Sequence, residues 1–141
     1  MKKLFLTLSV ISLIFTYSCK ESSGIDVTTE ENQIAEIVTD IDAKQFKELI
    51  NNQEGTILDV RTPEEWAEGT IPNATKMNYY EDNFPSMVEK LDKNKPVFVY
   101  CKRGGRSSSA AEILEEKGFK KIYNLDGGIT AWSDEGYETS K

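Results

Sequence analysis

The chain contains no histidine among its 141 residues, and this absence excludes several kinds of active site. A Ser-His-Asp triad, a Cys-His pair and a histidine-containing zinc site all need that residue. Cysteine is scarce too, being present only as Cys19 and Cys101. The 17 basic residues are outnumbered by 24 acidic ones, which gives a formal net charge of −7. Because nucleic-acid binding depends on a surplus of positive charge, we expect no nucleic-acid partner.

Long apolar runs are also missing. The longest mostly apolar stretch, from Leu4 to Phe15, is too short to span a bilayer, which takes about 20 residues. It follows Lys2 and Lys3 and leads to Cys19, an arrangement typical of a signal peptide. It resembles a bacterial lipoprotein signal, although Thr16 stands where that signal prefers leucine.

The resemblance implies that residues 1–19 are a lipoprotein-type signal peptide and that Cys19 becomes lipidated. We therefore expect an exported protein, anchored by its lipid to a membrane of the bacterial cell envelope and facing the periplasm or the outer membrane. An ordinary cleaved signal or an uncleaved anchor is the alternative. Residues 20–33 are polar and acidic, so we expect a flexible linker there, followed by one domain over residues 34–141.

The domain alternates between apolar runs and amphipathic stretches, which predicts an α/β fold. The pattern favours a mainly parallel central sheet of about five strands with helices on both faces. The runs that read as strands are 34–39, 56–60, 76–79, 97–100 and 121–124. The clearest helices are 43–52, which begins with a capping box at Asp42 and Gln45, then 82–91 and 107–117. We expect residues 136–141 to be frayed and the protein to be a monomer.

The most informative stretch is Cys101-Lys102-Arg103-Gly104-Gly105-Arg106-Ser107, which joins the strand 97–100 to the helix 107–117. The two glycines allow a tight curl whose backbone N–H groups, together with a helix N-terminus, form a site for anions. Such a site also lowers the pKa of a thiol, because the thiolate is itself an anion. Cys101 is therefore the candidate nucleophile.

This loop resembles the active-site loop of the rhodanese-like sulfurtransferases. Three further stretches fit that family in the same order: LDVRTPEEWAEGTIPNA at 58–74, MNY at 77–79 and NLDGGITAW at 124–132. The resemblance implies a rhodanese-like three-layer domain that moves sulfane sulfur through a Cys101 persulfide. The donor would be a small sulfur-containing anion, thiosulfate or a persulfide, and the acceptor a thiol or cyanide. It implies neither a metal nor an organic cofactor.

The same resemblance assigns roles within the loop. The backbone from Lys102 through Gly104 and Gly105 to Ser107 would hold the sulfur, and Lys102 and Arg103 would attract the donor. Arg106 would either bind the donor's oxygens or brace the loop. Two cations after the cysteine resemble the loops of thiosulfate users rather than of mercaptopyruvate users.

Asp59 and Arg61 lie at the carboxyl end of the strand 56–60, where ligands bind in open α/β folds. The resemblance favours a framework role for both near the site, and an ion pair of Arg61 with Glu64 or Glu65 is the alternative. The chain departs from the family nearby, because Thr70 stands in place of a histidine and Asn73 in place of a glycine.

Two other functions stay open. Cysteine-dependent phosphatases and arsenate reductases also use a cysteine and an arginine in an anion loop, but they place five residues between the two. Only four residues separate Cys101 from Arg106, and Ser107 falls where their arginine would stand. A non-catalytic binding module is the other alternative, although many such modules have lost the cysteine that this chain keeps.

Overall fold

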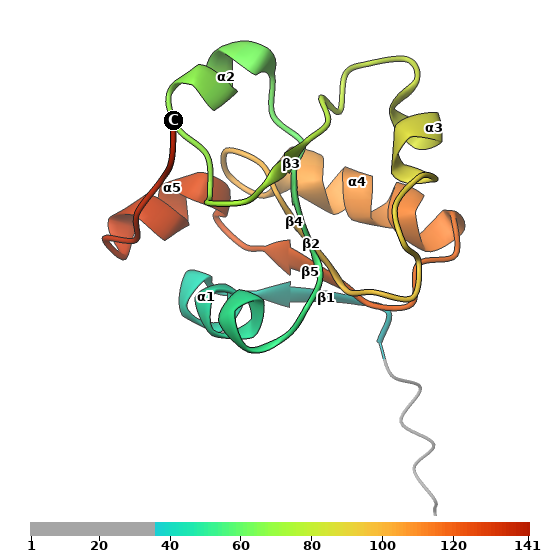
Figure 1. Ribbon diagram of the computed structural model, residues 1–141, viewed down its shortest axis with the longest axis horizontal. Helices are drawn as coiled ribbons and strands as arrows, with labels where there is room; N and C mark the ends of the chain where they lie inside the picture. The colour runs from blue at the N-terminus through green and yellow to red at the C-terminus, as the bar shows by residue number, and fades with distance from the viewer. Residues whose placement is uncertain (1–35) are drawn as a thin grey trace, which may run out of the picture. The chain divides into compact units, whose positions relative to one another are not determined.

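The computed structural model describes residues 36–141 (Figure 1). The predicted signal peptide with Cys19, the predicted linker 20–33 and the first two residues of the predicted domain lie outside the described residues. The described part alternates strands with helices. In chain order the elements are β1 Val38–Ile41, α1 Ala43–Asn52, β2 Thr56–Asp59, α2 Pro63–Ala67, β3 Thr75–Lys76, α3 Phe84–Val88, β4 Val97–Tyr100, α4 Gly105–Glu116, β5 Ile122–Leu125 and α5 Gly128–Asp134. Among the described residues, no helix is long and apolar enough to cross a membrane.

The strands form one five-stranded sheet in the order β1-β5-β4-β2-β3, and all four pairings are parallel. This confirms the predicted α/β class and the parallel sheet. The strand β4 lies in the centre between β5 and β2, where both of its edges are hydrogen-bonded. Because all strands run the same way, the loops that follow them gather at one edge of the sheet.

Helices cover both faces of the sheet, and the side chains of β4 alternate between the two cores. Val97 and Val99 pack with α3 and α4 on one face. Phe98 and Tyr100 pack with α1 and α5 on the other face. All four side chains are fully buried, which is why this strand is apolar throughout its length. Figure 1 shows the two helical layers on either side of the strands.

Most element boundaries agree with the sequence to within a residue or two, and the exceptions are β1, β3 and α3. The strand predicted over 34–39 is found at Val38–Ile41 and leads directly into the capping box of α1 at Asp42. The strand predicted over 76–79 is found at Thr75–Lys76. The helix α3 ends at Val88 because Lys90 and Leu91 donate to carbonyls only three residues back, which gives a tighter turn. The helix α4 begins at Gly105 rather than 107, so part of the anion loop is helical.

The expectation that residues 136–141 are frayed is wrong. Thr70 and Ser140 exchange two backbone hydrogen bonds of 2.8 Å in an antiparallel bridge. The Trp132 indole donates to the carbonyl of Glu138 at 3.0 Å, and the ring of Tyr137 packs edge-on against Trp132. Trp132 is itself fully buried, so the tail is attached to the core through it.

Candidate active site

The loop between β4 and α4 curls around the sulfur of Cys101. The Gly104 backbone N–H donates to Cys101 Sγ at 3.1 Å. Gly104 has a φ of +101°, a conformation that side chains rarely adopt, and it directly precedes the first residue of α4. The helix therefore starts with its free N–H groups beside the thiol, as the sequence predicted.

The turn at the start of α5 holds this loop in place through hydrogen bonds. The backbone N–H of Ile129 donates to the carbonyl of Cys101 at 2.9 Å, and the Thr130 hydroxyl donates to that of Lys102 at 2.8 Å. Gly128 makes this contact possible, since a Cβ there would lie within 2.7 Å of Arg103 N. The stretch 124–132 was singled out by its resemblance to the family, but the sequence could not show that it donates hydrogen bonds to the loop of Cys101.

The environment of Cys101 favours its thiolate. Burial raises the pKa of the Cys101 thiol, but the hydrogen bonds from Ser107, Arg103 and Gly104 outweigh it and hold that pKa below its usual value. The Ser107 hydroxyl lies 3.5 Å from the sulfur and 2.9 Å from the Gly104 carbonyl. Because a hydroxyl has one proton, Ser107 donates to one of these acceptors at a time.

An open hollow of about 480 Å³ lies over the sulfur and is lined by Cys101, Lys102, Arg103, Gly105 and Arg106. Lys102 and Arg103 are exposed, and neither forms an ion pair within residues 36–141. The structure thus brings the predicted site residues of the loop together around one sulfur atom. Their positive charge stands against the acidic background of the chain.

Arg106 has a specific partner that the sequence did not reveal. Its two terminal nitrogens donate to the two oxygens of Glu65 at 2.7 and 2.8 Å. Its guanidinium also lies over the ring of Tyr80, 5.6 Å from the centroid. The hydrogen bond from Arg106 holds the pKa of Glu65 near 2, against the opposing effect of its burial.

Asp59 and Arg61 form a buried network beside the loop. Arg61 donates to Asp59 through Nε and Nη2, the latter at 2.7 Å, and to the carbonyl of Gly69 at 2.7 Å. The Tyr100 hydroxyl donates to Asp59 at 2.6 Å and accepts from the backbone of Ile71 at 3.0 Å. Burial together with Asp59 raises the pKa of Tyr100, so it stays protonated. The alternative pairing of Arg61 with Glu64 or Glu65 is not what the structure contains.

The residues that replace the family's histidine and glycine have structural roles here. Thr70 is buried and pairs with Ser140. Asn73 has a φ of +65°, which explains why a glycine suits that position and why asparagine, which tolerates this conformation, replaces it.

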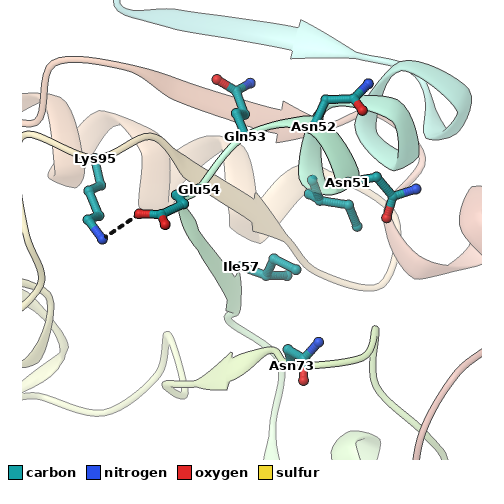
Figure 2. A pocket seen from close by; sticks show the side chains of 9 residues that line it. Asn51, Asn52, Gln53, Glu54, Ile57, Asn73 and Lys95 are labelled. Atoms are coloured by element: carbon teal, nitrogen blue, oxygen red, sulfur yellow. Dashed lines mark hydrogen bonds and ion pairs between the residues drawn. The ribbon is translucent and has the colours of Figure 1, made fainter.

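A larger hollow of about 630 Å³ lies elsewhere, where the end of α1 leads into β2 (Figure 2). Its lining includes Asn51, Asn52, Gln53 and Asn73, and the ion pair of Glu54 with Lys95 stands beside them. Its lining contains no cysteine, so we place the candidate active site at Cys101. Within the described part of the chain, no cluster of acidic or cysteine side chains suits a metal ion.

Comparison with known proteins agrees with this geometry. The rhodanese-like domain family matches residues 42–135, which include every element from α1 to α5. The chain belongs to the rhodanese-like family. A rhodanese-like domain protein from Staphylococcus aureus has the same fold, with a TM-score of 0.62 and 35% sequence identity over 73% of this chain and 99% of its own.

Curated relatives of this rhodanese-like chain carry different names. A sulfurtransferase of Allochromatium vinosum is 34% identical over 71% of this chain and 92% of its own length. The thiosulfate sulfurtransferase GlpE of Coxiella burnetii is 40% identical over 60% of this chain and 78% of its own. A tRNA uridine(34) hydroxylase of Pelagibacter ubique is 41% identical over 63% of this chain, which spans only 30% of that relative. At the level of the family, the names of the Allochromatium and Coxiella relatives support a sulfurtransferase.

Proposed function

We propose that this protein is a rhodanese-type sulfurtransferase that carries sulfane sulfur on Cys101. The observation that supports it most is the position of Cys101 Sγ, which accepts the N–H of Gly104 at 3.1 Å inside a cationic loop at the start of α4. The lowered pKa of this thiol fits a nucleophile. The names of the two sulfurtransferase relatives support the same reaction class.

The reaction has two steps. The Cys101 thiolate attacks the outer sulfur of thiosulfate, an S–S bond forms while the donor's S–S bond breaks, and sulfite leaves with the bonding electron pair. A persulfide anion remains on Cys101. A thiolate or cyanide then attacks the terminal sulfur, which yields a new persulfide or thiocyanate and restores the Cys101 thiolate. A persulfide donor reacts in the same way and releases a thiolate in place of sulfite.

The loop supplies stabilisation at each step. Free N–H groups at the start of α4, near Gly104, Gly105 and Ser107, would hold the negative charge on the terminal sulfur. Lys102 and Arg103 would attract the anionic donor, because both are exposed at the rim and are not ion-paired among the described residues. Asp59 and Arg61 would stabilise the structure beside the loop without contacting the donor.

Replacement of Cys101 by serine tests the proposal. We expect C101S to lose sulfur transfer from thiosulfate to cyanide and to keep the wild-type circular dichroism spectrum, since serine is nearly isosteric. Mass spectrometry of wild-type protein treated with thiosulfate should show one added sulfur atom on Cys101. A folded C101S protein that keeps more than about a tenth of the wild-type rate would contradict a covalent mechanism.

The same preparation should be offered an aryl phosphate. The anion loop is one residue shorter than the phosphatase pattern, and Arg106 is already bound to Glu65. We therefore expect no turnover of this substrate. Phosphatase turnover that depends on Cys101, without any persulfide, would replace the proposal with its main rival. A protein that is folded but inert in both assays would favour the binding module.

We also propose that Cys19 is acylated and anchors the protein to a membrane of the cell envelope. The support comes from the sequence alone, namely Lys2 and Lys3, the apolar stretch and the Ser18-Cys19 pair. Lipoprotein modification supplies more than one acyl chain, as stable anchoring requires. Mass spectrometry of the native N-terminus checks this, and an intact Met1 or an unmodified cleaved end would disprove it.

A further inference from the structure

One pair of side chains joins two segments that are 41 residues apart in the chain and meet at the rim of the active site. Arg106, from the first turn of α4, donates through both terminal nitrogens to Glu65, from α2. Both side chains are less than a fifth exposed. A Glu65 oxygen also accepts the Thr62 backbone N–H at 3.1 Å, and the ring of Tyr80 lies against the guanidinium. We call Glu65, Arg106 and Tyr80 the rim clasp.

The three cations around the hollow over Cys101 differ in whether a carboxylate already binds them. Arg106 lines the hollow over Cys101 together with Lys102 and Arg103. The planar fork of an arginine fits two oxygens of an oxyanion and binds them through two parallel hydrogen bonds. In Arg106 that fork is already filled by a carboxylate, which also neutralises its charge. Lys102 and Arg103 are exposed instead, and neither is ion-paired within the described chain.

We propose that Glu65 is a specificity-determining positioning residue, which withholds the Arg106 fork from the donor and so limits the affinity of the site for doubly charged oxyanions. The donor is then held by the loop N–H groups and by two flexible cations. Such a site recognises the sulfane sulfur atom of the donor more than the oxygen atoms of the group to which that sulfur is bonded. Thiosulfate, sulfate and phosphate would all gain affinity if the fork were released.

This inference rests on the proposed function only for its kinetic test. In E65Q the amide oxygen can still accept from Thr62, but it cannot neutralise Arg106. We expect the KM for thiosulfate to fall about three- to tenfold while kcat stays within about twofold. The gain should shrink as salt is added, because it is electrostatic. A brace with no role in donor affinity would instead lower kcat or leave KM unchanged.

The chain offers a matched control. Glu64 is the neighbouring residue on α2, is exposed, and forms no ion pair in the described structure. E64Q changes the net charge by the same amount, and we expect its KM to stay within about twofold of wild type. The double variant E65Q/R106Q should lose the gain of E65Q, because the fork itself is then absent. An equal fall of KM in E64Q and E65Q would overturn the inference.

A second measurement does not depend on sulfur transfer at all. Iodoacetate and iodoacetamide alkylate the same thiolate, but only iodoacetate is an anion. We expect the ratio of their rates at Cys101 to rise about threefold or more in E65Q and to stay constant in E64Q. If wild-type protein transfers no sulfur yet this ratio responds to E65Q, the proposed function fails and the inference stands. If transfer is normal and the ratio is unchanged, only the inference fails.

The variants must be folded for these results to count. E65D provides a conservative check, since it keeps the charge but shortens the side chain by one methylene and weakens the two-point contact. We expect a KM between those of wild type and E65Q, with an unfolding temperature close to that of wild type. A KM in E65D above that of wild type would contradict a restraining role for Glu65.

Discussion

Two arginine–carboxylate pairs stand close to Cys101, and they differ in depth. Asp59 and Arg61 are almost fully buried, with side chains 0% and 3% exposed. Glu65 and Arg106 lie at the rim, 17% and 19% exposed. The buried pair also binds the hydroxyl of Tyr100 and a backbone carbonyl, whereas Arg106 of the rim pair lines the hollow over the thiol.

We infer from this difference that the same chemistry serves stability in the buried pair and specificity in the rim pair. A buried ion pair must stay complete, because a lone charge in the interior cannot reach water. A rim pair can open at modest cost, since water replaces each partner. We therefore expect substitutions of Asp59 to act on the fold and substitutions of Glu65 to act mainly on the handling of anions.

The largest effect should follow the removal of Asp59. D59A removes the carboxylate that accepts from the Arg61 guanidinium and the Tyr100 hydroxyl and leaves the buried charge of Arg61 unpaired, so we expect it to lower the free energy of unfolding by about 3–5 kcal/mol. Urea unfolding followed by circular dichroism measures this. The control is D82A, an exposed aspartate whose loss should cost less than about 0.5 kcal/mol. A loss below about 1 kcal/mol for D59A would erase the contrast between the two pairs.

An intermediate effect should come from protonation of the rim pair. Arg106 holds the pKa of Glu65 near 2, below the ordinary value of 4.5, so its stabilisation is present above about pH 4.5 and is lost as the pH falls toward 2. We expect wild type to exceed E65Q in stability by about 1–2 kcal/mol at pH 7, after allowance for screening by water. The gap should close between pH 4.5 and 2. A gap that is constant with pH would show that the charge of Glu65 is not what stabilises the protein.

The smallest effect should come from a third pair, Glu89 with Lys117, which is 46% and 31% exposed. E89Q removes this charge interaction on the surface, far from the buried network. We expect no measurable change in the urea midpoint or in sulfur transfer, because water screens exposed pairs. This variant sets the baseline for the two pairs near the site, and a clear shift of its midpoint would break the ranking by burial.

The sequence predicted the order of strands and helices because its signals there are local. The capping box at Asp42 places the start of α1, and the apolar run 97–100 marks the central strand. Gly118 ends the turn after α4 with a φ of +87°, a conformation that glycine adopts without strain. The order of the C-terminal tail could not be predicted from local signals. It depends on a bridge between Thr70 and Ser140, two residues that lie 70 positions apart in the chain.

In the candidate site, too, the features that depend on local sequence could be predicted, and those that depend on tertiary packing could not. Cys101 and its glycines were visible as a motif, because a short loop contains all the atoms that the motif needs. The partner of Arg106 was not visible, since several glutamates were available and only the packing of α2 selects Glu65. The support from Ile129 and Thr130 was hidden for the same reason, because it depends on how β5 places α5 under the loop.

The sequence alone was therefore enough to identify the candidate nucleophile, the loop around it and the α/β alternation, since each is encoded within a few consecutive residues. The tertiary structure was needed to show which charged side chains near Cys101 form ion pairs and which do not. It placed Glu65 against Arg106 and left Lys102 and Arg103 exposed to solvent. The physical reason is that the strength of an ion pair depends on distance and burial, and both depend on the packing of segments remote in the chain.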